Sequence, residues 1–118
     1  NLIGDGAGYN NSGSANEIIG YEAGYSNSGT GNVLMGGSAG KANSGSYNNI
    51  FGTQSGFNNS GSYNNIFGYY AGHGNNGNYN EIFGYQAGQY MTSTSSIVIG
   101  SQALRGDGLG VFTAINNV

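Results

Sequence analysis

The sequence predicts an all-β fold, a parallel β-solenoid or β-roll of about seven coils with 16 residues in each coil. Three observations support this prediction: a strict 16-residue repeat, a high glycine and asparagine content, and no apolar pattern with helical spacing. Helical repeats need roughly 33 to 47 residues, and glycine at this density destabilises helices. Since strands stack about 4.8 Å apart, seven coils would form a rod roughly 34 Å long.

The composition lies far from that of ordinary globular proteins. The 118 residues include 25 Gly, 19 Asn and 10 Tyr, but no Pro, Cys or Trp. So much glycine and asparagine is typical of disordered segments, but the regular spacing of these residues indicates a fold instead. Without cysteine the chain forms neither a disulfide nor a thiolate metal site, so we expect its stability to come from stacked coils.

The repeat is visible as columns of identical residues spaced 16 positions apart. One copy, residues 64–79, reads Asn-Asn-Ile-Phe-Gly-Tyr-Tyr-Ala-Gly-His-Gly-Asn-Asn-Gly-Asn-Tyr. One glycine column has no exception and consists of Gly4, Gly20, Gly36, Gly52, Gly68, Gly84 and Gly100. The pattern decays after Gly88. We therefore expect a β-solenoid domain over residues 1–104, and a C-terminal cap or transition segment over 105–118 with a strand near 111–115.

Each coil is expected to contain one main strand, a second short strand and a turn. The main strand has the pattern Asn-x-Ile-Phe-Gly, as in residues 80–84, and the second has the pattern x-Ala-Gly-x, as in residues 86–89. The Asn-Ser-Gly segment at 59–61 has the composition of a turn. Asn tolerates the left-handed region there, and Gly adopts a positive φ without strain.

Alternation along the main strand separates an inner from an outer column. We expect the inner column of Leu, Ile and Val to fill a narrow interior opposite small Ala residues, with stacked Asn side chains hydrogen-bonded from coil to coil. The alternative is a coil wide enough to bury both columns. A soluble monomer rarely leaves a long apolar stripe in water, so we expect the outer column to be an oligomer interface. This outer column consists of Ile3, Ile19, Met35, Phe51, Phe67, Phe83 and Ile99.

Tyrosine columns are the clearest binding feature of the sequence. Exposed rings beside Asn and Ser side chains suit the recognition of sugars, so a cell-surface glycan or receptor is a candidate partner. The alternative is a structural role, because stacked rings stabilise neighbouring coils by about 0.5–1.5 kcal/mol per pair. The candidate ligand surface consists of Tyr47, Tyr63, Tyr79, Tyr69 and Tyr85.

The unit Asn-x-Ile-Phe-Gly-Tyr-x-Ala-Gly-x-x-Asn-Ser-Gly-x-Tyr resembles a repeat of many phage tail-fibre and tail-spike-like proteins. Residues 96–103, Ser-Ile-Val-Ile-Gly-Ser-Gln-Ala, are more loosely similar to units in the head β-rolls of trimeric autotransporter adhesins. The resemblance covers residues 1 to about 104. It implies a homotrimer, a role in surface attachment, and an extracellular location or one on the virion surface.

Neither catalysis nor a cofactor is expected. His73 is the only histidine, and its varied column suggests that it faces solvent. Glu17 and Glu81 share a column four coils apart, about 19 Å at the stacking distance, whereas glycosidase carboxylates lie about 5 to 9.5 Å apart. Asp5 and Asp107 occur singly in Gly-Asp-Gly, without the repeated acids of calcium-binding β-rolls, so no metal site is expected.

The remaining function classes are narrowed by charge and hydropathy. A net charge of −3 lacks the basic surface that binds a phosphate backbone, so nucleic acid is not expected as a partner. No apolar run approaches the roughly 20 residues of a membrane span, so membrane insertion is not expected either. We therefore expect a structural or attachment fibre, most similar to the phage type. The alternatives are a bacterial trimeric adhesin head and an ice-binding β-solenoid. Repeated Asn-Ser pairs favour the latter, but they lie in a glycine turn and no Thr-x-Thr column accompanies them.

Overall fold

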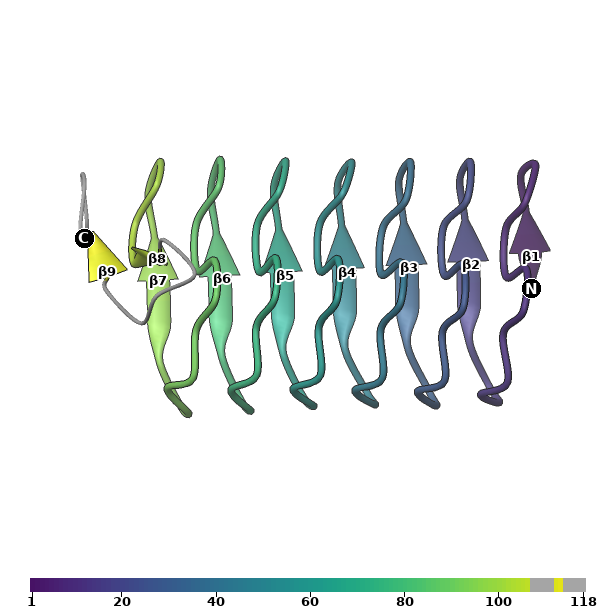
Figure 1. Ribbon diagram of the computed structural model, residues 1–118, viewed down its shortest axis with the longest axis horizontal. Coiled ribbons are helices and arrows are strands. Elements are labelled where there is room, and N and C mark those ends of the chain that lie inside the picture. The colour runs from purple at the N-terminus through teal and green to yellow at the C-terminus, as the bar shows by residue number, and fades with distance from the viewer. Residues whose placement is uncertain (107–111, 114–118) are drawn as a thin grey trace.

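The computed structural model describes residues 1–106 and 112–113, and these residues form strands and turns without a helix. Figure 1 shows near-identical coils stacked along one axis, with the N-terminus at one end and the last strands at the other. The molecule measures 35 Å along its longest axis and 22 and 20 Å along the others. These dimensions match the rod that the repeat predicts.

Seven strands form one parallel sheet, in chain order along the solenoid axis. Each residue of β1 to β6 pairs with the residue 16 positions later, as Ile50 does with Ile66. This register confirms the predicted parallel β-solenoid with 16-residue coils. The strands are β1 (Leu2–Ile3), β2 (Glu17–Ile19), β3 (Val33–Met35), β4 (Asn49–Phe51), β5 (Asn65–Phe67), β6 (Glu81–Phe83) and β7 (Ile97–Ile99).

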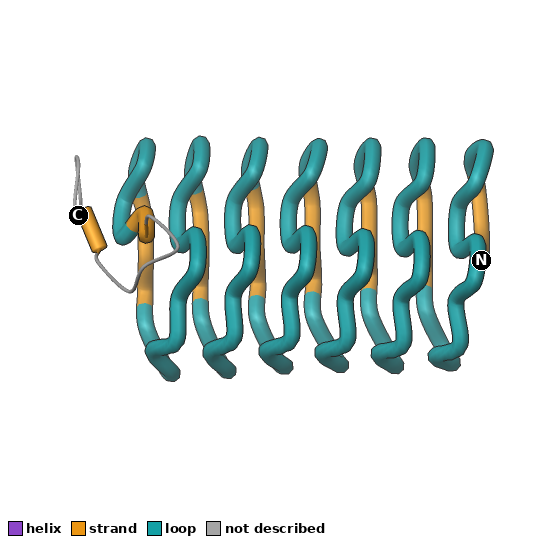
Figure 2. The backbone as a smooth tube through the Cα atoms, in the orientation of Figure 1, coloured by secondary structure: helices purple, strands orange, loops and turns teal. Residues whose placement is uncertain are grey.

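The remainder of each coil consists of turns and irregular backbone, as Figure 2 shows. The second strand predicted over residues 86–89 is wrong, because these residues form consecutive turns. Gln86 and Gly88 have φ values of 55° and 63°, which an extended strand cannot contain. The turns are still bonded to the next coil: the Gly88 N–H donates to the Ala103 carbonyl at 2.8 Å.

The Asn-Ser-Gly segment does not adopt the backbone conformation predicted for it. Neither Asn59 nor Gly61 has a positive φ, whereas Asn58 just before the segment and Tyr63 just after it have φ values of 55° and 60°. Glycine is needed at position 61 for another reason, because the backbone of the next coil lies very close to it. A Cβ at this position would lie 1.9 Å from the carbonyl oxygen of Gly77 in the next coil.

The core is a single file of aliphatic side chains enclosed by alanines. The inner column is fully buried from Ile18 to Ile82, and Val98 is only 2% exposed. There is no room for a second apolar column: a Cβ on Gly56 would lie 2.5 Å from Cδ1 of Ile50. The outer column is absent from this core, so the predicted division into inner and outer columns is confirmed.

The last coil departs from the repeat. Leu104 replaces the glycine of earlier coils and packs against the core. Beyond it, β8 (Arg105–Gly106) pairs antiparallel with β9 (Phe112–Thr113). Strand β9 falls within the strand predicted over 111–115, and the rest of that range and residues 107–111 of the predicted cap lie outside the described residues.

Candidate functional site

A ladder of asparagines, all buried except the half-buried Asn11, joins successive coils. Each side-chain amide donates to the side-chain oxygen of the preceding member, at 2.7–2.9 Å. The same amide also donates to the carbonyl of the glycine two residues later, as Asn59 does to Gly61 at 2.7 Å. This arrangement confirms the predicted coil-to-coil hydrogen bonds. We call it the turn ladder, and it consists of Asn11, Asn27, Asn43, Asn59 and Asn75.

A second buried ladder precedes the strands. Here each side-chain oxygen accepts the backbone N–H of the matching residue in the next coil, at 2.8–2.9 Å. The two ladders satisfy polar groups that would otherwise be costly to bury. They also hold every coil in the same register, so the columns on the outside are regularly spaced. This strand ladder consists of Asn16, Asn32, Asn48, Asn64 and Asn80.

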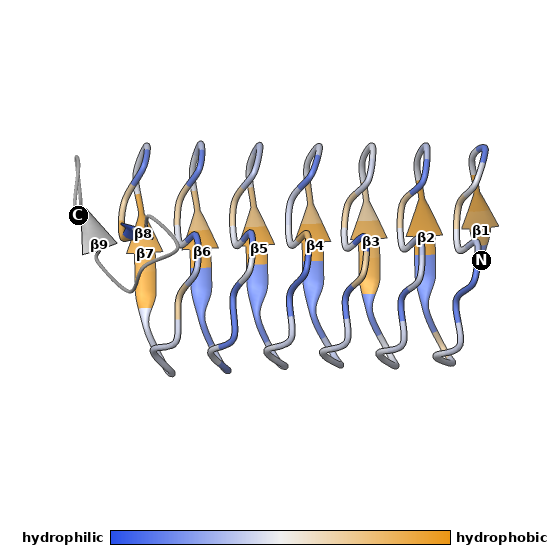
Figure 3. Cartoon of the chain, in the orientation of Figure 1, coloured by the Kyte–Doolittle hydropathy of each residue, from blue (hydrophilic) through white to orange (hydrophobic). Residues whose placement is uncertain are grey.

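The outer column runs along the exposed face of the sheet. Ile3 and Ile99 at its ends are 59% and 42% exposed, and the five residues between them are half-buried. The rings of Phe51, Phe67 and Phe83 stack face to face, with centroids 4.8 and 4.9 Å apart. Figure 3 shows apolar residues at the same place in all seven strands, and this band contains the buried inner column as well as the outer column beside it. The predicted interface residues thus form one continuous apolar surface.

A polar ladder borders the outer column, and the sequence reasoning missed it. The Asn49 amide donates to the Asn65 side-chain oxygen at 2.7 Å, and the Asn65 amide donates to the Glu81 carboxylate at 2.8 and 3.0 Å. The signal was the same 16-residue spacing one position before the inner column. Because Glu81 already accepts these hydrogen bonds, this part of the sheet face carries few unsatisfied polar groups.

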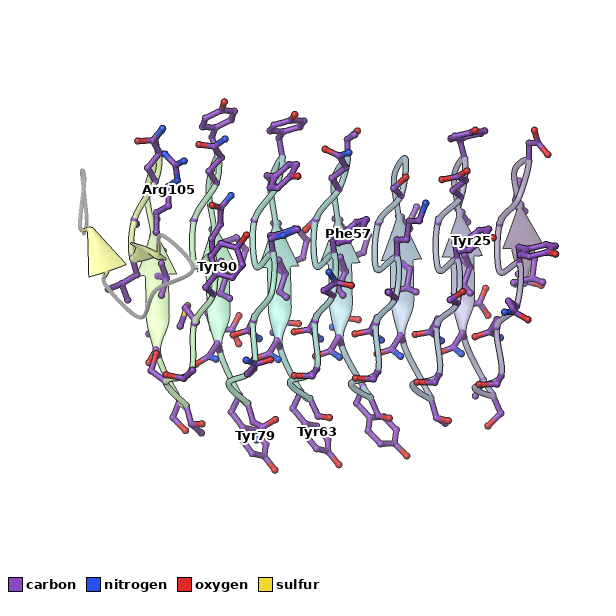
Figure 4. The ribbon with its side chains drawn as sticks, in the orientation of Figure 1. Tyr25, Phe57, Tyr63, Tyr79, Tyr90 and Arg105 are labelled. Carbon is purple, nitrogen blue, oxygen red and sulfur yellow. The ribbon has the colours of Figure 1, made fainter. Side chains whose placement is uncertain are left out.

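The tyrosines of the candidate ligand surface form two separate ladders. Tyr47, Tyr63 and Tyr79 stack with centroids 5.2 and 4.9 Å apart, and Tyr69 stacks on Tyr85 at 5.5 Å. The consecutive turns of each coil, such as residues 85–90, form a side of the solenoid that we call the turn face. Figure 4 places Tyr63 and Tyr79 at one edge of the solenoid, away from this face. Both faces of the Tyr63 ring are covered by neighbours, so only its edge and hydroxyl are available to a ligand.

His73 lies in an aromatic cluster on the turn face. Its ring centroid is 5.3 Å from that of Phe57, 4.8 Å from that of Tyr70 and 5.3 Å from that of Tyr90. The ring is half-buried, so His73 lies at the surface but is only partly exposed to the solvent that its varied column predicts. Its Nδ1 atom is buried without a hydrogen-bond partner, and desolvation lowers the pKa of His73 below 6.5.

Nothing in residues 1–106 gathers groups for metal chemistry. No three His, Asp or Glu side chains there lie close enough together to hold an ion. Glu17 in β2 and Glu81 in β6 are separated by three intervening strands. No helix in the described part of the chain is long and apolar enough to cross a membrane.

Comparisons with known proteins add no family to this description. No family model matches the chain, and no curated protein or solved structure matches it either. The resemblance to phage tail-fibre repeats and adhesin heads therefore stays a prediction. The functional conclusion depends on the surfaces described above.

Proposed function

We propose that this chain is a structural segment of a surface-attachment fibre, in which copies of the solenoid assemble through the outer column. The assembly would be a homotrimer, located outside the cell or on a virion surface, as the resemblance to phage tail-fibre repeats implies. The observation that carries the proposal is the continuous apolar column on the sheet face. A patch of this length is rarely left in water by a soluble monomer.

The regular spacing of the column supports self-association. Every coil presents one apolar side chain at the same place, so a second copy meets a matching residue at each coil. A closed cyclic arrangement then covers the column on every copy at once. The low charge of the face also helps: Glu22 and Lys41 form an ion pair with each other at 2.8 Å, away from the sheet, and need no partner in the assembly.

A bacterial adhesin head would use the same architecture and the same interface. The ice-binding alternative rests on the serines of the Asn-Ser pairs, which are exposed but lie outside the strands, and a different hydroxyl column is engaged within the solenoid. The Thr30 N–H donates to Ser46 Oγ and the Ser46 N–H donates to Ser62 Oγ, both at 3.0 Å. These hydroxyls are less available to an ice lattice than a free column would be. Thermal hysteresis at micromolar protein concentration would favour ice binding over the fibre.

The Phe67→Asp variant tests the assembly. The wild type is expected to sediment at three times its 12.0 kDa chain mass, and the variant at the mass of one chain, because the interface would have to bury an unpaired carboxylate. Tyr63→Ser is the matched control, since serine already occurs in its column at Ser95 and this column is not part of the outer column. A wild type that sediments as a monomer, or an unchanged Phe67→Asp assembly, would overturn the proposal. Circular dichroism verifies that both variants remain folded.

A further inference from the structure

We propose that a pocket between the first coil (residues 1–15) and the second (residues 16–31) binds one pyranose ring of a glycan. The carboxylates of Asp5 and Glu22 would accept hydrogen bonds from its hydroxyl groups. This inference rests on the attachment role proposed above and names the class of ligand. The pocket has a volume of about 290 Å³ and is lined by Asp5, Gly6, Tyr9, Tyr21, Glu22 and Tyr25.

The repeat itself shows what fits in this space. Gly6 and Tyr70 occupy the same position of the repeat, with φ values of 68° and 59°. The Tyr70 ring lies between its neighbours Tyr69 and His73, with centroids 5.5 and 4.8 Å away. The residues that correspond to these neighbours in the first coil both line the pocket, and Gly6 leaves the space between them open. A six-membered ring of about the size of the tyrosine ring therefore has space where the pocket lies.

One ring of the pocket differs from those of the tyrosine ladders. Tyr9 and Tyr25 stack on each other with centroids 5.0 Å apart, as ladder rings do, whereas Tyr21 has no ring stacked on it and is 61% exposed. Tyr21 is followed in its column by Gly37, so no ring from the next coil covers it. A sugar can pack its C–H groups against such a ring. The pocket thus offers the free ring faces of Tyr21, whereas in the predicted ligand surface each ring has at least one face covered by a neighbour.

The charges of the pocket favour a sugar over a cation. Lys41 bonds to Oε2 of Glu22 at 2.8 Å, and its ammonium lies 4.8 Å from the Tyr25 ring centroid. An internal cation therefore already occupies the cation–π position on Tyr25. The hydrogen bond from Lys41 lowers the pKa of Glu22, so this carboxylate stays ionised and able to accept hydrogen bonds at neutral pH. Carboxylates that accept from hydroxyls are the kind of polar group that orients a sugar.

The test is saturation-transfer NMR on the full chain with three probes: methyl α-mannopyranoside, methyl β-glucopyranoside and methyl β-galactopyranoside. At least one probe is expected to receive saturation at its ring protons from the wild type. The Gly6→Tyr variant copies the Tyr70 arrangement and fills the pocket. The nearest atoms to a Cβ on Gly6 all belong to Glu22, at 3.4 Å for Cγ, 3.7 Å for Cα and 3.8 Å for the backbone nitrogen, and Tyr70 adopts a similar positive φ, so we expect this variant to fold.

We expect Gly6→Tyr to weaken probe binding by roughly tenfold or more, which corresponds to about 1.4 kcal/mol. The double variant Asp5→Asn with Glu22→Gln keeps the shape of the pocket and should also weaken binding. Tyr63→Ser should leave it unchanged. The inference is wrong if no pyranoside binds, if Gly6→Tyr binds as the wild type does, or if tetramethylammonium binds and the pyranosides do not.

Sedimentation of the same samples separates this inference from the proposed function. Assembly without probe binding would refute the sugar pocket alone. Probe binding by a monomeric wild type would refute the assembly and leave the pocket supported. If Gly6→Tyr loses both probe binding and its circular dichroism signal, the double variant decides, since it introduces no new ring.

Discussion

The asparagine ladders inside the solenoid and the aromatic columns outside it have the same spacing but differ in how much variation they contain. The turn ladder is asparagine in five successive coils, whereas the column that contains His73 holds Tyr, Lys, Phe, His, Gln and Arg. Inside, each amide makes hydrogen bonds whose geometry few side chains can reproduce. Outside, rings meet at centroid distances of about 5 Å, and other side chains can fill the same space. Inner residues therefore define the fold, and outer residues are free to serve function.

The glycines at the turns show this difference most strongly, so Gly61→Ala is expected to have the largest effect. The new Cβ would lie 1.9 Å from the Gly77 carbonyl oxygen and 2.9 Å from Nδ2 of Asn64. Relief requires the coils to separate, which breaks ladder hydrogen bonds. We expect a loss of about 4 kcal/mol or more in the free energy of unfolding, measured by urea titration.

Gly37→Ala is the matched control for this variant. Gly37 lies in a variable column on the outside of the solenoid, between Tyr21 and Thr53. It has no positive φ, and a Cβ there would have Thr53 Cγ2 as its nearest neighbour, at 3.8 Å. This substitution should be neutral or slightly stabilising, because it reduces the freedom of the unfolded chain. Equal losses in the two variants would contradict a specific role for coil-to-coil contact at Gly61.

Asn59→Met tests the turn ladder itself. Asn59 is fully buried, donates to Asn43 Oδ1 at 2.8 Å and to the Gly61 carbonyl at 2.7 Å, and accepts from Asn75 at 2.9 Å. Methionine is tolerated at Met91, where the ladder has ended. Within the ladder it would leave buried polar groups without partners, and we expect a loss of about 2–4 kcal/mol in thermal or urea unfolding.

The neighbouring residue supplies the control for the ladder. Asn58 is exposed and has a φ of 55°, and the next coil has Gly74 at the same position. Asn58→Gly should therefore change the unfolding free energy by no more than about 0.5 kcal/mol. If Asn59→Met were equally mild, the ladder would be dispensable and the aliphatic core alone would hold the coils together.

The sequence is sufficient to predict the inner half of this structure. An aliphatic column at Ile66 beside an apolar column at Phe67, each kept in every coil, indicates a strand with two apolar faces, since residues one apart in a strand face opposite sides. The 16-residue spacing then fixes the register of every pair in the sheet. Buried asparagine ladders are predictable for the same reason, because a polar residue repeated without change inside a coil must find partners in its own column.

The turn face could not be predicted in this way. The strand expected over 86–89 fails because Gln86 is left-handed, and a glutamine gives no sign of a positive φ. Only the column as a whole holds a hint, since Gly6 occupies the same position. The pocket at Gly6 was missed because an open space depends on which rings lie around it. The 16-residue repeat predicts the features that all coils have in common, whereas the proposed pocket depends on residues in which the first coil differs from the others.

The smallest expected effect belongs to the variable column that contains His73, where the His73→Phe variant isolates a single titration. Desolvation lowers the pKa of His73 in the folded chain, so the unfolded chain binds more protons at a pH below about 6.5. Stability is therefore fully present above that pH and is lost as the pH falls from 6.5 through the lower folded pKa. Carboxylates titrate mainly below about pH 5 and contribute little at the start of this window.

The wild type should show a falling melting temperature between pH 7.5 and 5.5, measured by circular dichroism, and the His73→Phe variant a flatter profile over the same range. Phenylalanine continues the stack on Phe57, whose ring lies 5.3 Å from that of His73, so the two proteins should differ little at neutral pH. A variant that melts far below the wild type at neutral pH would place His73 with the specific inner residues rather than with the replaceable outer ones.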